Sequence, residues 1–393
     1  MSIVLTNKQL EGLNIAIERY KNHEKYTVIS GFAGTGKSTL VKFLIQSLPG
    51  IDPDEDVVFA TFTGKAAQVL MSKGNRNAMT LHKLLYDSVP KPDGTFLRKP
   101  KFKLEYKIVV VDEVSMAPKD MIDLLFTHNI YVICLGDPFQ LPPINKDSDN
   151  HLLDNPHVFL DEVMRQAKES EIIRLTMDIR EGKTLNNFDG QDVKVYNQSD
   201  LNTGMLLWAN QIISGTNKTR VNINNNMRTL LERGDNPEEG DKLICLKNYW
   251  DYFADNGDYL VNGTIGYLSD VYGSFNIIPP FFGGGRIDTT NGVFTSDTGA
   301  TYGKLQMDKK EILTGERCLD SKTIYRLMGS RKYSHLVPME FTYGYAITCH
   351  KSQGSQWDKV LVIEEKFPFD KVEHARWLYT AATRAISKLV IIK

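Results

Sequence analysis

The sequence has few of the features that mark zinc-binding, disulfide-linked, secreted or membrane-spanning chains. Its 393 residues include four cysteines, which lie at least 31 positions apart with no C-x-x-C pair, so neither a zinc ribbon nor a disulfide framework is expected. The longest apolar run covers residues 130–135, far short of the roughly 20 residues that span a bilayer. The N-terminal segment carries charges where a secretory signal would be apolar. These absences predict a cytoplasmic protein.

An excess of charge of one sign is also missing. Lysine and arginine total 47 against 48 acidic residues, so composition alone does not indicate a nucleic-acid partner, and such a partner must be argued from local patches. Apolar residues make up 41% and charged residues 24%, which is ordinary for globular proteins and excludes a mainly disordered or fibrous chain. The length corresponds to two or three domains.

Short β-branched segments alternate with helical patterns in the first half of the chain. Buried parallel strands have this composition, and their alternation with helices predicts a doubly wound α/β sheet. The expected strands are residues 26–30, 57–61, 107–111 and 130–135, and the expected helices are residues 38–47 and 65–72.

Two segments depart from this pattern. Residues 87–107 combine an Asp93-Gly94 turn with several lysines, which predicts a small basic β hairpin inserted in the first domain. Ten of the 29 glycines fall between Gly257 and Gly303 among short apolar runs, and this predicts a small antiparallel β barrel or sandwich over residues 240–340. The α/β pattern surrounds it, with strands expected at 211–214, 359–363 and 389–392. The second α/β domain is therefore expected to be interrupted by a β module.

A phosphate-binding loop follows the first expected strand. The segment Gly31-Phe-Ala-Gly-Thr-Gly36-Lys37-Ser38 fits G-x-x-x-x-G-K-[ST] in full and opens an expected helix, as the motif requires. Backbone N–H groups of such a loop surround phosphate, while the lysine reaches the β and γ phosphates and the serine holds Mg²⁺. The alternative is a glycine-rich turn closed by an N-capping serine. The residues expected at the nucleotide are Gly34, Thr35, Gly36, Lys37, Ser38 and Thr39.

An acidic pair ends the third expected strand. In Val109-Val-Val-Asp112-Glu113, the strand places its carboxylates at the carboxyl edge of the sheet, beside the phosphate loop. Asp112 is expected to hold Mg²⁺, and Glu113 to orient or deprotonate the attacking water. A solvated acidic turn is the alternative, but the neighbouring phosphate loop favours a hydrolase.

Two large classes of phosphate-loop protein are excluded. A small GTPase needs Asn-Lys-x-Asp to recognise guanine, and the nearest match, Asn217-Lys218-Thr219-Arg220, ends in arginine. The LSGGQ signature of ABC-type ATPases is absent from the sequence.

The remaining motifs occur in a diagnostic order. They are Thr6-Asn-Lys-Gln9, Ala60-Thr-Phe62-Thr63-Gly-Lys65, Thr80-Leu-His82, Leu135-Gly-Asp137-Pro-Phe-Gln140, Ala346-Ile-Thr348-Cys-His350-Lys-Ser352-Gln353-Gly354 and Leu378-Tyr-Thr-Ala-Ala-Thr-Arg384-Ala. Together they resemble superfamily 1 DNA helicases of group B, and most closely the Dda and RecD group. The resemblance extends from residue 6 to 392 and is weakest between 250 and 340.

The resemblance implies two RecA-like motor domains with ATP in the cleft between them. It implies adenine recognition by Gln9 and coupling of the γ-phosphate to DNA contacts by Gln140. Arg165 and Arg384 match the two arginines that approach the γ-phosphate, while Gln353 and Gly354 would line the cleft from the second domain. Gln9 also fits a capping box with Thr6, and both roles are compatible. Arg165 could instead be a surface arginine.

The same motifs imply a strand-binding surface across both domains. Hydroxyl and cationic side chains suit phosphate contacts, and aromatic rings suit stacking on bases. The expected residues are Phe62, Thr63, Lys65, Thr80 and His82 in the first domain and Thr348, His350 and Ser352 in the second. In this group the inserted hairpin forms a pin at the duplex junction, where Phe96 would stack on a base. The alternatives are a structural role for His350 and a packed or solvated position for Phe96.

The expected fold is α/β, with two RecA-like parallel-sheet domains. Motor domain 1 covers residues 1–185 with the pin at 87–107, motor domain 2 covers 186–239 and 340–393, and an inserted SH3-like β domain covers 240–339. The expected activity is ATP- and Mg²⁺-dependent translocation on single-stranded DNA, 5′ to 3′ by resemblance, with unwinding at duplex junctions. A monomer with unidentified replication or repair partners is expected. A nucleotide-gated clamp, a protein-displacing translocase and an RNA-directed motor are the alternatives.

Overall fold

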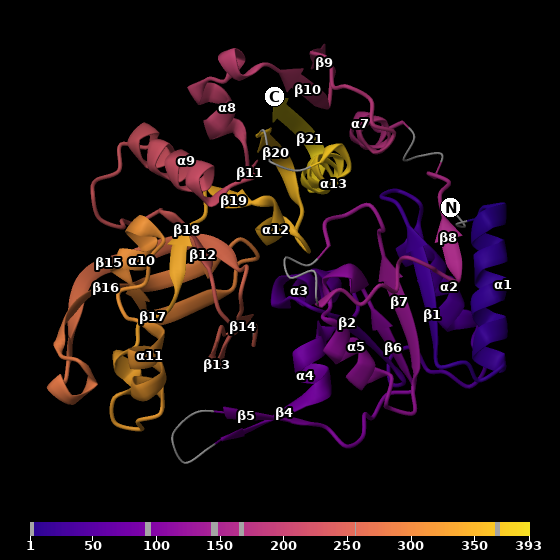
Figure 1. Cartoon of the computed structure of the whole chain (residues 1–393), viewed down its shortest axis with the longest axis horizontal. Coiled ribbons are helices and arrows are strands. Elements are labelled where there is room, and N and C mark those ends of the chain that lie inside the picture. The colour runs from indigo at the N-terminus through magenta and orange to yellow at the C-terminus, as the bar shows by residue number, and fades with distance from the viewer. Residues whose placement is uncertain (1–3, 91–95, 143–147, 165–168, 256, 366–369) are drawn as a thin grey trace.

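The first α/β unit contains a sheet of six parallel strands (Figure 1). The computed structural model describes residues 4–90, 96–142, 148–164, 169–255, 257–365 and 370–393. In spatial order the strands are β3 (Met79–Thr80), β2 (Val57–Thr61), β6 (Ile108–Val111), β7 (Tyr131–Gly136), β1 (Tyr26–Gly31) and β8 (Val158–Leu160). The helices of this unit are α1 (Asn7–Lys21), α2 (Lys37–Ser47), α3 (Gly64–Ser72), α4 (Leu81–Leu85) and α5 (Lys119–Leu125).

Burial explains why these segments form a doubly wound sheet. Strands β6 and β7 are buried along their whole length, as apolar strands covered on both faces must be. Helix α2 buries Leu40, Val41, Leu44 and Ile45. All four strands and both helices expected here from the sequence are confirmed. Because the strands are parallel, the loops after β1, β2, β6 and β7 meet at one edge of the sheet.

The second α/β unit contains another six-stranded sheet, parallel except for its edge strand β9. In spatial order its strands are β19 (Ala346–Thr348), β11 (Gln211–Ser214), β20 (Trp357–Ile363), β21 (Ala385–Ile392), β10 (Val193–Tyr196) and β9 (Phe188–Asp189). Its helices are α7 (Glu171–Arg180), α8 (Thr203–Trp208), α9 (Asn217–Leu230), α12 (Cys349–Ser352) and α13 (Lys371–Ala382).

Helix α7 packs on this second sheet. Ile172 and Ile179 lie in one buried cluster with Trp377 and Leu389. The division drawn from the sequence placed residues up to 185 with the first domain. An amphipathic pattern shows that a helix buries one face, but it does not show which sheet that face covers, and this explains the difference.

The β module contains a five-stranded antiparallel sheet and a two-stranded hairpin, and it forms a separate lobe in Figure 1. In spatial order the sheet consists of β17 (Thr301–Asp308), β16 (Gly285–Ser296), β15 (Ile265–Ile278), β12 (Lys242–Cys245) and β18 (Phe341–Tyr343). The hairpin pairs β13 (Tyr249–Phe253) with β14 (Tyr259–Leu260), and the helices are α10 (Lys309–Thr314) and α11 (Ser321–Met328). Strand β18 lies beyond the expected limit of 339 because its residues complete this sheet by pairing with β12.

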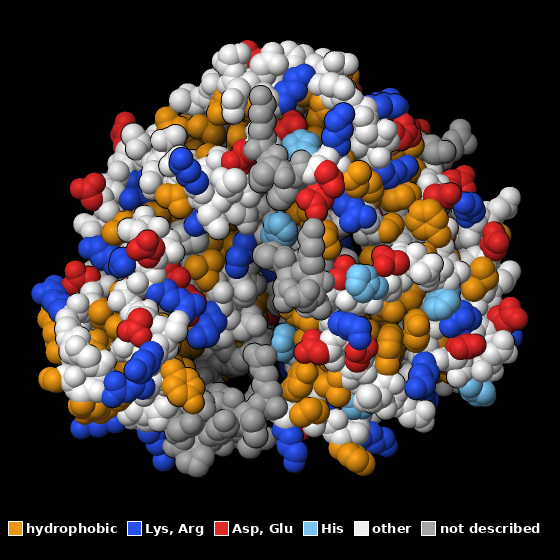
Figure 2. Space-filling view, in the orientation of Figure 1, with side chains coloured by type: hydrophobic (Ala, Val, Ile, Leu, Met, Phe, Trp, Pro, Cys, Tyr) orange, Lys and Arg blue, Asp and Glu red, His pale blue; other side chains and the backbone are white. Residues whose placement is uncertain are grey.

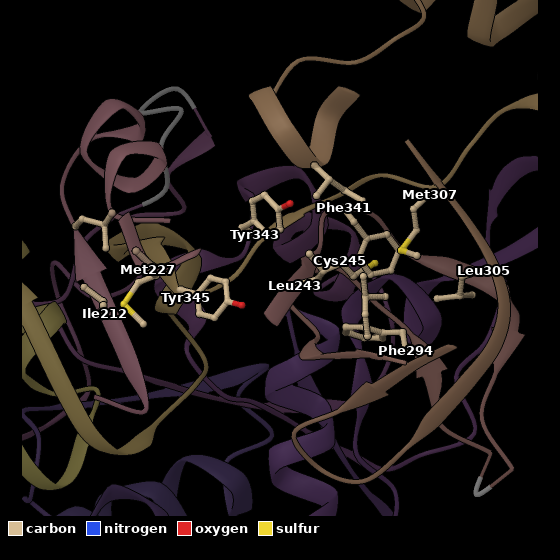
Figure 3. Packing of buried hydrophobic residues seen from close by; sticks show 14 of the residues in the cluster. Ile212, Met227, Leu243, Cys245, Phe294, Leu305, Met307, Phe341, Tyr343 and Tyr345 are labelled. Carbon is tan, nitrogen blue, oxygen red and sulfur yellow. The ribbon is translucent and has the colours of Figure 1, made fainter. Parts of the chain in front are cut away.

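The core of the module continues into the second α/β unit. Figure 3 shows Phe294, Leu305 and Phe341 on the module side and Ile212 on the other, with Tyr343 and Tyr345 between them. All of these residues belong to one buried cluster. The module and the second sheet are therefore joined by a continuous apolar core.

The basic hairpin expected from the sequence is present, but it is shorter than 87–107. Strand β4 (Tyr86–Pro90) pairs antiparallel with β5 (Phe96–Pro100). Residues 91–95 and the Phe96 side chain lie outside what the structure describes. Among the described residues, no helix combines the length and apolar character that crossing a bilayer requires.

Candidate functional site

The phosphate loop joins β1 to α2 and curls through two glycines in the left-handed region. Gly34 has φ 76° and Gly36 has φ 80°, backbone conformations that residues with a side chain rarely adopt. A Cβ atom on Gly36 would lie 2.3 Å from Gln9 Nε2, so this position also lacks space for a side chain. The loop therefore has the backbone shape that surrounds a phosphate group.

Gln9 holds the loop from α1. Its Nε2 donates to the carbonyl of Thr35 at 3.1 Å, and its Oε1 accepts from the backbone N–H of Thr6 at 3.0 Å. The capping box with Thr6 is present, and Gln9 is buried. Thr35 is also buried and donates to Phe32, while Thr39 is half-buried in α2. The capping role of Gln9 is confirmed, whereas the adenine role stays a prediction.

Lys37 lies at the centre of a charged cluster. Its Nζ donates to the carbonyls of Gly31 and Phe32 at 2.6 and 3.0 Å. Burial lowers the pKa of this ammonium, while the carboxylates of Asp137, Asp112 and Glu113 act in the opposite direction. The side chain is thus held at the loop among anionic groups, in position to exchange a carbonyl for a phosphate oxygen.

Asp112 and Glu113 follow β6 at the same edge of the sheet. Asp112 Oδ1 accepts from the backbone N–H of Glu113 at 2.9 Å, and Glu113 has φ 52°. Burial raises the pKa of both carboxyls. Glu113 Oε2 is buried, and the backbone N–H of Gly354 faces this carboxylate and acts to lower its pKa. A buried acceptor of this kind suits a water molecule that must lose a proton.

Arg384 approaches this pair from the second sheet. Its Nη1 lies 3.8 Å from Glu113 Oε1, and its Nε donates to the carbonyl of Thr380 at 3.0 Å. Gly354 and Gln140 line the same cavity, which has a volume of about 310 Å³. Residues from both α/β units therefore surround one cavity that also contains Gly34, Lys37, Ser38, Asp112, Glu113 and Arg384.

Several residues expected at the nucleotide do not line this cavity, namely Gln9, Thr35, Gly36, Thr39 and Gln353. Gln353 lines the neighbouring groove, and its Nε2 donates to the carbonyl of Leu141 at 2.9 Å. Arg165 lies outside the described residues.

The structure adds residues that the sequence analysis did not single out. Asp137, Lys73 and Gln356 line the cavity. The hydroxyl of Tyr379, from α13, donates to Asp137 Oδ2 at 2.7 Å and accepts from the backbone N–H of Ala33 at 2.8 Å. Asp137 and Tyr379 lay within quoted motifs, but no spacing rule indicated that they would meet.

A second, larger groove lies where the first α/β unit, the second α/β unit and the β module meet, and Figure 2 shows the surface hollowed there. It has a volume of about 670 Å³, and five expected strand-binding residues line it: Phe62, Thr63, Lys65, Thr348 and His350. Burial lowers the pKa of His350, which favours the neutral form of its imidazole. The ring of His82 lies 5.8 Å from that of Phe62.

Other expected strand-binding residues have local structural contacts. Ser352 is fully buried and donates to the carbonyl of Cys349 at 2.7 Å. Thr80 caps α4 by accepting from the backbone N–H of Lys83 at 3.2 Å. The position of the Phe96 side chain is not described. The groove is thus formed by about half of the expected set.

This combination of fold and site defines a class. A phosphate loop and an acidic strand end in one RecA-like sheet, facing an arginine from a second, have the arrangement that is typical of the nucleotide site in two-domain P-loop NTPases. A family model described as an AAA domain matches residues 7–201, and a UvrD-like helicase C-terminal domain matches residues 343–392. The two models together match more than half of the chain.

Curated relatives agree with this class. The ATP-dependent DNA helicase dda of Enterobacteria phage T4 is 26% identical over 191 residues, or 46% of this chain and 43% of its own. The ATP-dependent RecD2 DNA helicase of Deinococcus radiodurans is 24% identical over 386 residues, or 92% of this chain and 46% of its own. The chain spans less than half the length of both relatives.

Solved structures show the same fold. The Pif1 helicase from Bacteroides, in complex with ADP-AlF3 and ssDNA, has a TM-score of 0.54 at 18% identity, covering 99% of this chain and 92% of that one. The structure of Pif1 helicase from Candida albicans has the same TM-score and identity, and the match covers 100% of this chain and 95% of that one. The chain belongs to the superfamily 1 helicases of the Dda, RecD and Pif1 group.

Proposed function

We propose that the chain is an ATP-hydrolysing motor that moves along single-stranded DNA and separates duplexes. The observation that carries this proposal is the position of Arg384 from one sheet beside Glu113 from the other, in a cavity that also contains Lys37. A bound triphosphate would contact both domains, so its hydrolysis would change how strongly they are held together.

The residues of the cavity fit ATP and Mg²⁺. Mg²⁺ is commonly held by one or two protein oxygens together with substrate phosphates, and it neutralises charge on the transferring phosphoryl group. Ser38, which is exposed at the start of α2, and Asp112 line the same cavity and would supply those oxygens. Lys37 would hold the β and γ phosphates, and Glu113 would take the proton of the attacking water. Arg384, with Arg165, would stabilise charge that develops on the γ-phosphate.

The groove beside the cavity supports nucleic acid as the track. Thr63 and Lys65 come from the first unit, and Thr348 and His350 from the second. A strand in this groove would be held by both units, so opening and closing of the cleft would move one set of contacts relative to the other. We propose residues 4–164 and 186–239 with 344–393 as the two motor units, with α7 packed on the second and residues 240–343 as the module. The 5′ to 3′ direction and a cytoplasmic monomer remain part of this proposal.

The test measures ATP hydrolysis and strand separation with the whole chain. Single-stranded DNA should stimulate hydrolysis, and a 5′-tailed duplex should be unwound faster than a 3′-tailed one. Lys37→Ala should abolish turnover while leaving DNA affinity within about tenfold, because the phosphate and strand contacts use different residues. Normal turnover of this variant would refute the assignment of the nucleotide site. Binding without stimulated hydrolysis would indicate a clamp, and stimulation by RNA alone an RNA motor. Displacement of bound protein without unwinding would indicate a protein-displacing translocase.

A further inference from the structure

A further groove lies at the edge of the first sheet opposite to the cavity that contains Lys37 and Asp112. Its lining includes Lys25, Lys107 and Ile130, which come directly before β1, β6 and β7. Phe62 lines the groove of about 670 Å³ described above, which we call the strand groove, and Asp112 lines the cavity of about 310 Å³, which we call the nucleotide cavity. These two residues directly follow β2 and β6. Because these strands are parallel, the two sets of residues lie at opposite ends of the sheet. We call the groove lined by Lys25, Lys107 and Ile130 the amino-edge groove, because these residues precede their strands. Its volume is about 1450 Å³.

The amino-edge groove is strongly basic in a chain whose net charge is −1. Six lysines and two glutamates line it, whereas the strand groove has four lysines and arginines against two glutamates. Lys107 is paired with Asp56 at 2.8 Å, and Lys101 donates to the carbonyl of Lys83 at 3.1 Å. Within the described part of the chain, the other four lysines have no ion pair and are exposed: Lys21, Lys25, Lys99 and Lys103. Such a surface attracts a polyanion.

An aromatic side chain projects from the middle of this surface. Phe102 lies between Lys101 and Lys103 and is 102% exposed, so nothing in the protein covers its ring. The segment itself is fixed, because the backbone N–H of Lys101 donates to Leu85 at 2.8 Å and Leu104 is buried in the first-domain core. An exposed ring on a fixed backbone segment, flanked by cations, is a combination that holds unpaired bases and their phosphates.

The hairpin connects the two grooves. Strand β4 leaves α4, whose His82 contacts Phe62 in the strand groove, and β5 ends at Pro100, where the amino-edge groove begins. Figure 2 shows Lys and Arg side chains at the lower margin of the first α/β unit, below the base of the hairpin in Figure 1. A nucleic acid divided at the hairpin would therefore have one groove on each side of the division.

We propose that the amino-edge groove binds the strand that is separated from the tracked one, with Phe102 stacked on one of its bases and Lys25, Lys99 and Lys103 at its phosphates. A single strand fits better than a duplex, because the face of a base is available to Phe102 only when it is unstacked. This proposal rests on the proposed function, since a separated strand exists only if the chain opens duplexes.

The test measures equilibrium binding, without nucleotide, to a fork with two single-stranded tails and to the two substrates that lack one tail each. The tracked tail is the 5′ tail, along which the motor is proposed to move. The wild-type protein should bind the fork more tightly than the substrate that has only this tail. The triple substitution of Lys25, Lys99 and Lys103 by Gln should remove this advantage, about tenfold or more at low salt, and should lower the salt slope on the fork by about 2. Phe102→Ala should weaken fork binding about fivefold or more, and an abasic second tail should have the same effect on the wild type.

A matched control replaces three exposed lysines elsewhere, Lys42, Lys322 and Lys371, by Gln. It changes net charge equally and should leave the fork advantage intact. An equal loss in this control, an equal loss on the tracked-tail substrate, or loss of affinity for a blunt duplex would each overturn the proposal. DNA-stimulated ATP hydrolysis, measured in parallel on single strands, reports on the proposed function independently.

Discussion

Lys65 Nζ lies 2.6 Å from Asp297 Oδ1, and this ion pair joins the first motor unit to the β module at the strand groove. Asp297 follows β16, and Lys65 is in the first turn of α3. The lysine side chain is 8% exposed and the carboxylate 29%, so the pair is mostly removed from water. The lysine expected to contact a DNA phosphate is thus bound to an anion that the protein itself supplies.

Asp297→Asn is expected to strengthen binding of single-stranded DNA. The substitution keeps the shape of the side chain and removes the charge that competes with phosphate for Lys65. Because the carboxylate of Asp297 keeps some contact with water, which weakens its attraction for Lys65, the gain should be modest, about two- to fivefold. Titration of a labelled oligonucleotide at several salt concentrations measures it. Asp288→Asn, which breaks the exposed pair with Arg286, is the control and should have no effect. Weaker binding by Asp297→Asn would mean that the pair supports the groove.

Tyr379→Phe is expected to lower ATP turnover while leaving ATP affinity nearly unchanged. The variant keeps the ring contact with Phe139, whose centroid lies 5.3 Å away, but loses the hydroxyl that bridges Ala33 and Asp137 across the cleft. Leaving those two groups unpaired costs about 1–3 kcal/mol, and the loss falls on the closed arrangement of the domains. Steady-state hydrolysis at saturating DNA gives kcat and KM separately.

The control for Tyr379→Phe is Tyr131→Phe, which removes a buried hydroxyl within the first unit. That hydroxyl donates to the carbonyl of Ala16 at 3.1 Å and does not line the nucleotide cavity. This variant should lower thermal stability and leave kcat unchanged. Equal losses of kcat in both variants would show that the effect of Tyr379→Phe is a general loss of stability.

The sequence predicted the parts of the site that lie in continuous motifs. The phosphate loop and the Asp112-Glu113 pair were identified because strand, turn and helix signals coincide within a few residues. The Tyr379–Asp137 and Lys65–Asp297 contacts were not, since their partners are 242 and 232 positions apart and only the folded chain brings them together. The same reason explains β18 and α7, whose patterns indicate secondary structure but not the sheet that they join.

Glu113→Gln is expected to bind ATP and to hydrolyse it at least about 100-fold more slowly, because the amide keeps the shape of the side chain and cannot accept a proton. Because burial raises the pKa of this carboxyl, it becomes protonated at a higher pH than an ordinary glutamate, and wild-type hydrolysis should decline as the pH falls through that range. The control is Glu55→Gln on the exposed surface of the same unit. Loss of ATP affinity with the residual rate preserved would instead make Glu113 a structural or metal-binding group.

Phe96→Ala is expected to impair unwinding of a tailed duplex much more than DNA-stimulated ATP hydrolysis. Phe96 begins β5 opposite Pro90, at the end of the hairpin farthest from its base. A ring at that place would stack on a base at the junction, which contributes about 1–3 kcal/mol. Unwinding and hydrolysis are measured on the same substrate and expressed as base pairs opened per ATP. Phe188→Ala, on the edge strand β9, removes another exposed ring and should leave that ratio unchanged. Equal loss of both activities in Phe96→Ala would indicate a packing role, and no loss of unwinding would leave the hairpin without a strand-separating function.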